Sequence, residues 1–464
     1  MSERLGSAVR DEARPWDARP TEDAVRRLSG LDFAVLWGDL GVGMLVIVAG
    51  ALLVPALGLP QALLAIVLGS ALGCIPLALV SRAGADHGIP TMVLLRPVLG
   101  ARGSMAPTVL NVAQLVGWTA FELWAMALIA SKVTGPLFGL KSFWIWLAVA
   151  GALCLALSLG GPVVVVRRWM ERFGVWVVGG VAAWITFRLF AETDLSAVWA
   201  RPGAGEFPTF WQGVDLVIAL PVSWIPLVAD YSRFARRGVS SAGGTYAGYL
   251  VANVWFYAIG ALLVLGAGVA PFPGPAAVGE GILTLAGGTI VLLALLVGET
   301  DEAFADIYSA AVSIQNLAPR ARQRPLVVAV ALVGVALAAW LFGQPDEGVA
   351  SYELFLFLIG SVFVPLAGVF VADHVLLRRG RLDADGLFDP RGPGAGVRVR
   401  AIVAWVLGFV AFQAVFPTGP GWWTAWMDGL PGIPLFGGAF SASVTSFVVA
   451  GVARLLLRER AAGR

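Results

Sequence analysis

The segment at residues 111–124, NVAQLVGWTAFELW, carries residues that could hold a flat polar ligand. They follow one another at intervals of three, four and four residues and therefore share one face of a helix: Asn111, Gln114, Trp118 and Glu122. Trp118 offers an aromatic face for stacking, and an ionised Glu122 only accepts hydrogen bonds, which favours a ring with N–H or amino groups. In the alternative interpretation, Trp118 packs inside a helix bundle and Glu122 pairs with a basic residue. No Lys or Arg lies at comparable depth in any predicted helix.

A second segment, VGETDEAFADIYSAAVSIQN, combines carboxylates and hydroxyls on one helix. Glu299, Glu302 and Asp306 lie at offsets of zero, three and seven, again on one face, with Asp301 beside them and Ser309 one turn on. Clustered carboxylates repel one another, so some must be protonated or share a cation. The segment therefore predicts a cation site, unless Glu299 to Glu302 lie in a water-filled vestibule.

The third candidate is Asp39, which lies in a glycine-rich stretch with Gly38, Gly41 and Gly43. A break in a membrane helix exposes carbonyl oxygens and half-helix dipoles that coordinate cations or polar ligands. Asp39 could instead cap the half-helix that follows the break. The predicted cation-binding residues are Gly38, Asp39, Asp301, Glu302 and Ser309, with Na+ or H+ as the ion.

Composition places these segments in lipid. The chain has 464 residues, of which 58% are hydrophobic and only 13% are charged, about half the charged fraction of a soluble domain. His87 and His374 lack metal-ligand spacing, Cys74 and Cys154 lie in apolar runs, and no phosphate-binding loop is present. No cofactor, nucleic-acid partner, enzymatic activity or primary ATP-driven transport by this chain is expected.

Twelve stretches are long and apolar enough to be membrane helices. They lie at approximately 31–57, 61–80, 107–129, 143–159, 173–190, 211–228, 244–269, 282–318, 325–342, 352–377, 401–416 and 432–457. With the N-terminus in the cytoplasm, 28 of the 32 Lys and Arg residues lie in inner segments, as the positive-inside rule requires. We therefore expect a multi-pass protein of the plasma membrane with both termini in the cytoplasm.

The interruptions in the first and sixth spans indicate an internal repeat. Gly38 to Gly43 interrupt the first, and Pro221, Ser223 and Pro226 interrupt the sixth, at corresponding positions of two inverted five-helix repeats. This predicts an all-α, leucine-transporter-like core at 31–377, with repeats at 31–190 and 211–377. Cytoplasmic tails at 1–30 and 458–464, a cytoplasmic loop at 378–400 and two accessory helices at 401–457 complete the chain.

Several segments resemble the nucleobase:cation symporters, which carry cytosine, purines, hydantoins and related rings. The resemblance covers roughly 31–377 and rests on GIPTMVLLRPVLGARGS, NVAQLVGWTAFELW, SWIPLVADYSRFAR, DIYSAAVSIQN and FLIGSVFVPLAGVFVADH. Within the family, the SWIPLVADYSR and DIYSAAVS segments are most similar to the branch proposed to carry hydroxymethylpyrimidine, a thiamin precursor.

The resemblance implies roles for individual residues. Trp118 would stack on one face of the ring and Trp224, next to Ser223, on the other, while Glu122 would bind the N–H edge of an aminopyrimidine. The predicted substrate site is Gln114, Trp118, Glu122, Ser223, Trp224 and Asp306. Sodium-coupled relatives use hydroxyls as ion ligands where this chain has Asp301 and Glu302. Because of this difference, the resemblance is compatible with coupling to Na+ or to H+.

The sequence thus predicts a secondary active transporter that imports a planar nitrogen heterocycle, such as hydroxymethylpyrimidine or cytosine, with a cation by alternating access. Two alternatives remain. The first is an amino-acid or amine symporter with the same fold, in which carboxylate and ammonium groups are recognised instead of a ring. The second is a membrane sensor or enzyme without a transport cycle.

Overall fold

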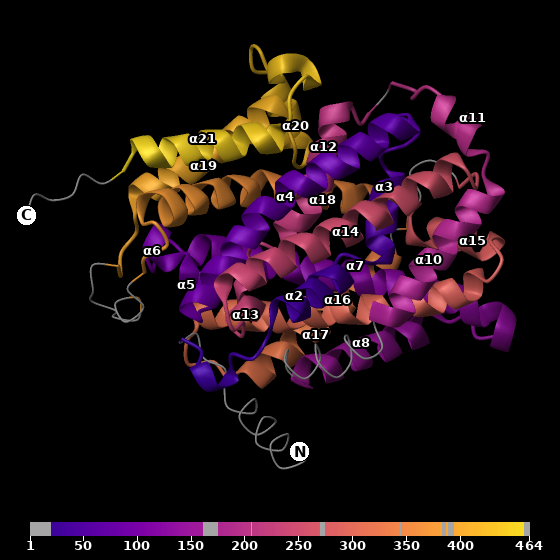
Figure 1. Ribbon diagram of the computed structural model, residues 1–464, viewed down its shortest axis with the longest axis horizontal. Coiled ribbons are helices and arrows are strands. Elements are labelled where there is room, and N and C mark those ends of the chain that lie inside the picture. Colours follow the sequence, from indigo (N-terminus) through magenta and orange to yellow (C-terminus); the bar gives the residue numbers. More distant parts are fainter. Residues whose placement is uncertain are drawn as a thin grey trace, which may run out of the picture.

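The computed structural model describes residues 20–160, 175–205, 207–269, 274–343, 345–382, 387 and 394–458. Within these residues the regular secondary structure is helical, and one isolated parallel β-bridge joins Leu28 and Ala235. The long helices pack side by side (Figure 1). The short helices of the predicted inner loop, α5 (Thr91–Leu94) and α6 (Arg96–Leu99), lie at one end of the bundle. The short helices of predicted outer loops, α11 (Leu195–Ala200) and α15 (Pro275–Thr284), lie at the opposite end.

Each of the twelve predicted spans corresponds to a helix or a pair of helices in the described part of the chain. In order these are α2 (Gly30–Asp39) with α3 (Met44–Ala51), α4 (Leu59–His87), α7 (Met105–Phe138), α8 (Phe143–Gly160), α10 (Val175–Glu192), α12 (Phe210–Ser223) with α13 (Val228–Ser232), α14 (Gly238–Leu265), α16 (Gly288–Leu317), α17 (Gln323–Phe342), α18 (Pro345–Phe370) continued by a π-helical segment (Val371–Leu377), α19 (Val399–Val415) and α21 (Ala442–Leu456). Among the described residues, seven spans are long and apolar enough to cross a membrane, and the bent pair α2–α3 makes an eighth. The all-α membrane fold is therefore confirmed.

The first and sixth spans are both broken, although Gly38, Pro221 and Ser223, which are predicted to interrupt them, still lie within α2 and α12. Helices α2 and α3 meet at an angle of 61° across residues 40–43, which include Gly41 and Gly43. Helix α12 ends at Ser223 and α13 begins at Val228, with Pro226 between them. Proline removes a backbone donor, and glycine in a helix is less favourable than other residues, so both interrupt the hydrogen-bond ladder at these points.

Two predicted spans begin several residues before the helices that form. The eighth span was expected from 282, but α15 ends at Thr284 and α16 begins only at Gly288, because Gly287 has a left-handed φ of 80°. The last span was expected from 432, but α21 begins at Ala442. Gly437 and Gly438, both at positive φ, prevent an earlier helix, and Ser441 caps the one that forms.

Other predicted boundaries lie partly outside the described residues. This applies to the tails at 1–30 and 458–464, to the loop at 378–400 and to the start of the fifth span at 173. The division of the core into repeats at 31–190 and 211–377 stays a prediction.

Close packing of small residues holds the broken first span against α14. A Cβ added at Gly244, Gly248 or Gly260 of α14 would lie 2.0–2.2 Å from a carbonyl oxygen of α2 or α3. Membrane helices use such small residues to bring their backbones together. The segment that carries Asp39 is therefore positioned by direct backbone contact with its neighbour.

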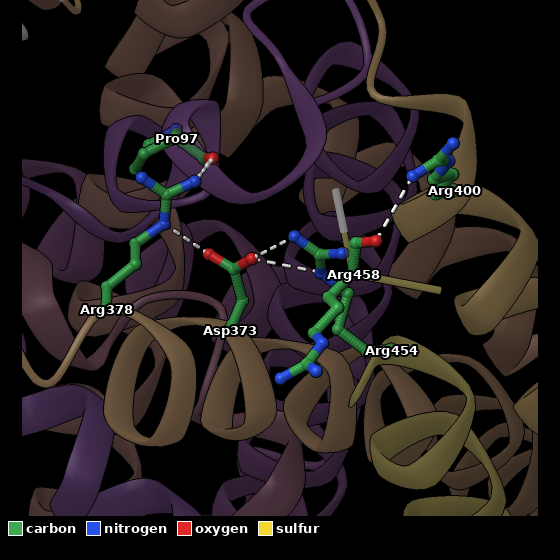
Figure 2. Close-up of polar contacts among 6 residues, drawn as sticks. All are labelled: Pro97, Asp373, Arg378, Arg400, Arg454 and Arg458. Atoms are coloured by element: carbon green, nitrogen blue, oxygen red, sulfur yellow. Dashed lines mark hydrogen bonds and ion pairs between the residues drawn. The ribbon is translucent and has the colours of Figure 1, made fainter. Parts of the chain in front are cut away.

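Buried carboxylates attach the accessory helix α21 to the core at both ends. At its N-terminus, Asp215 of α12 accepts hydrogen bonds from Ser441 Oγ at 2.5 Å and from the amides of Ala442 and Ser443 at 2.8 and 3.0 Å. At its C-terminal end, Arg454 donates through Nε to Asp373 at 2.9 Å. Figure 2 shows that Asp373 also accepts from Arg378, which lies on its other side.

Arg378 extends this contact to the inner loop. Its Nη2 donates to the carbonyl oxygen of Pro97, on α6, at 2.7 Å (Figure 2). Asp373 and Arg454 are 1% and 4% exposed, so their charges compensate each other away from water. Helices α12, α18 and α21 and the inner loop are thereby joined by specific polar contacts.

Candidate functional site

The polar stripe predicted at 111–122 lies on α7 and faces the centre of the bundle, where all four residues are buried. Gln114 donates through Nε2 to Asn111 Oδ1 and to the carbonyl oxygen of Ser223, both at 2.8 Å. Asn111 in turn donates to Ser313 Oγ at 2.9 Å. The third span thus contacts both the end of α12, where the sixth span breaks, and the carboxylate-bearing helix α16.

Trp118 and Trp224 line the same cavity. Its other lining residues come from the break in the first span and from α12, α14 and α16: Leu40, Leu45, Val46, Leu220, Tyr249 and Glu302. The cavity measures about 10 Å³, near the minimum that holds one water molecule. It places two indole rings and one carboxylate around a narrow space between the broken helices.

Neighbouring aromatic side chains fix the orientation of the two indoles. Trp224 Nε1 donates to the Tyr249 hydroxyl at 2.9 Å, and the Trp37 ring packs edge-on at 5.8 Å between centroids. Trp118 packs edge-on against Phe355 and Tyr352 of α18, at 5.2 and 6.0 Å. Tyr352 also donates to the carbonyl oxygen of Leu45 at 2.9 Å, so α18 contacts both the stacking residue and the broken first span.

Glu122 lies elsewhere on the stripe. It does not line the cavity, and its carboxyl group faces that of Asp306 on α16. Neither carboxyl has a hydrogen-bond donor among the described residues. Since two carboxylates only accept hydrogen bonds, a shared proton would be needed to join them.

Glu299 binds the start of α3. Its Oε1 accepts a hydrogen bond from the amide of Met44, the first residue of that half-helix. A Cβ at Gly43 would lie 2.7 Å from Glu299 Oε1 and 2.5 Å from Glu302 Oε1, so a larger residue here would displace both carboxylates. A negative charge at a helix N-terminus is favourable, and Glu299 therefore has the capping role that the sequence left open for Asp39.

Asp39 faces Asp301 across the interface between α2 and α16. Asp39 is 3% exposed and Asp301 is fully buried, as is Glu299, so these carboxylates do not lie in a water-filled vestibule. Gly38 and Asp39 also border an apolar groove of about 330 Å³ between α2, α10 and α14. This arrangement brings oxygen ligands together at the break, as a cation site requires.

Ser309 is separated from the other predicted cation ligands. Its hydroxyl lies beside the carboxyl of Asp230 and beside Tyr231, both on α13. The structure therefore distributes the predicted cation residues over three places. Gly38, Asp39 and Asp301 lie at the break. Glu302 lies between the break and the aromatic cavity, with its Oε1 beside Gly43, and Ser309 lies near α13.

Three residues that contribute to this geometry were missed in the predicted site: Tyr249, Glu299 as a cap, and Tyr352. Tyr249 and Tyr352 are buried tyrosines whose hydroxyls have partners on other spans. Buried tyrosines are a signal for such contacts, because the hydroxyl requires a hydrogen-bond partner. Their partners are distant in sequence and could not be read from spacing.

Comparison with known proteins agrees with this architecture. Residues 20–429 match the family described as permeases for cytosine/purines, uracil, thiamine and allantoin. A hydantoin permease of Microbacterium maritypicum is 25% identical over 421 residues, which cover 84% of this chain and 82% of that protein. An allantoin permease of Bacillus subtilis (strain 168) is 25% identical over 438 residues, covering 84% and 85%.

Solved structures show the same fold. Mhp1, a nucleobase-cation-symport-1 family transporter in a closed conformation with bromovinylhydantoin bound, has a TM-score of 0.78 at 20% identity, covering 95% of this chain and 94% of its own. A Na+-coupled sialic acid symporter has a TM-score of 0.59 at 13% identity, covering 98% and 94%. The chain is a multi-pass membrane transporter and belongs to the nucleobase:cation symporter family of cytosine, purine and related permeases.

Proposed function

We propose that this permease imports a planar nitrogen heterocycle, such as hydroxymethylpyrimidine, cytosine or a related nucleobase, together with Na+ or H+. The observation that carries the proposal is the cavity between Trp118 and Trp224, which also contains the Glu302 carboxylate. Two indole faces suit a flat ring, and a carboxylate suits its N–H edge. Relatives named for hydantoin and allantoin transport support the same substrate class.

Binding of a ring requires movement of the cavity walls. A space of about 10 Å³ admits roughly one water molecule, so a pyrimidine can enter only when the lining side chains or helices separate. Trp224 follows the end of α12, and Leu45 and Val46 lie in α3, so the two broken spans provide movable walls. In transporters of this architecture, broken helices form the binding site, and alternating access moves one repeat or bundle against the other around that site.

The cation would bind at the break between α2 and α3, where Asp39 faces Asp301. Glu299 holds the start of α3 beside this position, and Glu302 extends from the same helix to the aromatic cavity. A cation that orders the break therefore also orders the cavity. Binding of the ion and of the ring should then strengthen each other by the same factor.

Uptake into proteoliposomes tests the proposal. Radiolabelled cytosine is offered with Na+ and H+ gradients imposed separately, and unlabelled hydroxymethylpyrimidine, purines, hydantoin and an amine serve as competitors. We expect gradient-driven uptake that a heterocycle inhibits, with the effective gradient naming the ion. Competition by the amine alone would support an amine symporter with the same fold.

Trp118→Ala should abolish this uptake while the protein remains folded, because the stacking surface is lost. Trp340→Ala on α17 is the matched control, since Trp340 is 58% exposed on the outside of the bundle and its removal should leave uptake unchanged. Normal uptake by Trp118→Ala would overturn the stacking role. Lack of both uptake and ring binding by folded wild-type protein would overturn the substrate class.

A further inference from the structure

Three buried carboxyl groups near the aromatic cavity have no compensating positive charge in the described part of the chain. Glu122, Glu302 and Asp306 are 1–4% exposed and form no ion pair with a described Lys or Arg. Arg233 is also buried, and it donates to the hydroxyl of Tyr308 at 3.1 Å. An uncompensated charge at membrane depth costs about 2.5–3.5 kcal/mol or more, so each carboxylate requires a proton or a cation.

The geometry divides these three groups. Glu122 and Asp306 face each other, so a proton held between them removes one charge and provides a hydrogen bond. Glu302 is different, because it lines the cavity with Trp118 and Trp224. Its Oε1 is buried without a hydrogen-bond donor in the described residues. Because Oε1 also lies beside Gly43 and Glu299, the partner of Glu302 must come from the cavity, from solvent or from a cation at the break.

The other walls of the cavity also suit a positive charge. The indoles of Trp118 and Trp224 and the ring of Tyr249 line it, and aromatic faces attract cations, with Trp the most effective. A neutral ring would stack equally well but would give the Glu302 carboxylate no counter-charge inside the cavity. Aromatic walls combined with one unpaired carboxylate favour a charged ring over a neutral one.

We propose that the heterocycle binds in this cavity as a cation, with its positive charge against the Glu302 carboxylate. The inference rests on the proposed function, since it concerns the charge of the same ring. A ring nitrogen that carries a proton and the adjacent amino group can donate in parallel to the two carboxylate oxygens, which is the strongest hydrogen-bond arrangement available to them. Each ring then carries one positive charge into the cavity. A permanently charged ring would bind beside Glu302 without first taking up a proton.

Equilibrium binding to the purified full chain in nanodiscs tests the charge. The three probes are 4-aminopyrimidine, its ring-N-methylated pyrimidinium, which is permanently charged, and the uncharged pyrimidin-4-one. We expect the pyrimidinium to compete for the same site and to bind about tenfold or more tightly than the oxo ring, as one charge-assisted contact provides. As the pH falls, the affinity for 4-aminopyrimidine relative to that for the pyrimidinium should rise, because more of the 4-aminopyrimidine is protonated.

Substitution of the proposed counter-ion gives the second readout. Glu302→Gln should weaken pyrimidinium binding by about 10- to 100-fold and leave pyrimidin-4-one within a few-fold, whereas Glu302→Asp should retain the preference for the cation. Equal affinities for charged and neutral rings, with equal effects of Glu302→Gln on both, would overturn the inference and leave the proposed function intact. Absence of binding by all three rings to folded protein would instead overturn the proposed function.

Discussion

Gly248→Ala should weaken the contact between α14 and the broken first span. A Cβ at this position would lie 2.2 Å from the carbonyl oxygen of Ala34 and 2.9 Å from its Cα, whereas ordinary contact begins at 3.4 Å. The obstructing atoms belong to the backbone of α2, so no side-chain rotation relieves an overlap of about 1 Å, and overpacking of this kind costs about 1–3 kcal/mol. The two helices must separate, and α2 carries Asp39 at its end.

Gly243→Ala on the same helix is the matched control. A Cβ there meets nothing within 4 Å, and replacing a helical glycine by alanine adds up to about 1 kcal/mol of helix stability. Thermal unfolding of both variants in detergent, followed by loss of the monodisperse peak in size-exclusion chromatography, compares them directly. We expect a lower midpoint for Gly248→Ala and an unchanged or higher one for Gly243→Ala. A midpoint for Gly248→Ala at or above wild type would refute the backbone contact.

Two further substitutions test the buried carboxylates that hold helix ends. Glu299→Ala should lower thermal stability and uptake, because it removes a capping acceptor worth about 1 kcal/mol or more. Glu299→Gln keeps an acceptor and should lower both by less. An equal loss of stability in the two variants would argue against capping of α3. Asp215→Ala should release the N-terminus of α21, at a cost of about 1–3 kcal/mol for each amide left unpaired. Hydrogen exchange measured by mass spectrometry should then increase in α21 while α17 stays protected, and unchanged exchange in α21 would contradict this attachment.

The broken spans were predictable because their causes are local. Glycines at 41 and 43 and the proline at 226 act on their own helices, and the structure breaks both spans there, whereas Pro221 lies within α12. The one-face arrangement on α7 follows equally from helical spacing. Burial of this stripe could be expected as well, since polar residues in a membrane helix usually face the protein interior.

The pairing of carboxyl groups could not be predicted from spacing. The rotation of α7 relative to α16 determines whether Glu122 faces Asp306 or the cavity. Packing with other helices sets this rotation. The contact between Asp215 and the start of α21 joins residues 226 or more positions apart, and Glu299 reaches Met44 across 255. Charge patterns indicate that such groups need partners, but tertiary structure selects them.

The spacing of the carboxylates on α16 gives a physical route for coupling an ion to a ring. Glu299, Glu302 and Asp306 share one helical face, yet each reaches a different neighbour: the start of α3, the aromatic cavity and Glu122 of α7. Because they lie within two turns of one rigid helix, a change in charge at one alters the electrostatic energy of the other two. A cation that neutralised the carboxylates at the break, as proposed above, would therefore change the energy of placing charge beside Glu302. Helix α16 would transmit this effect without a large movement of its own, while the broken spans move around it.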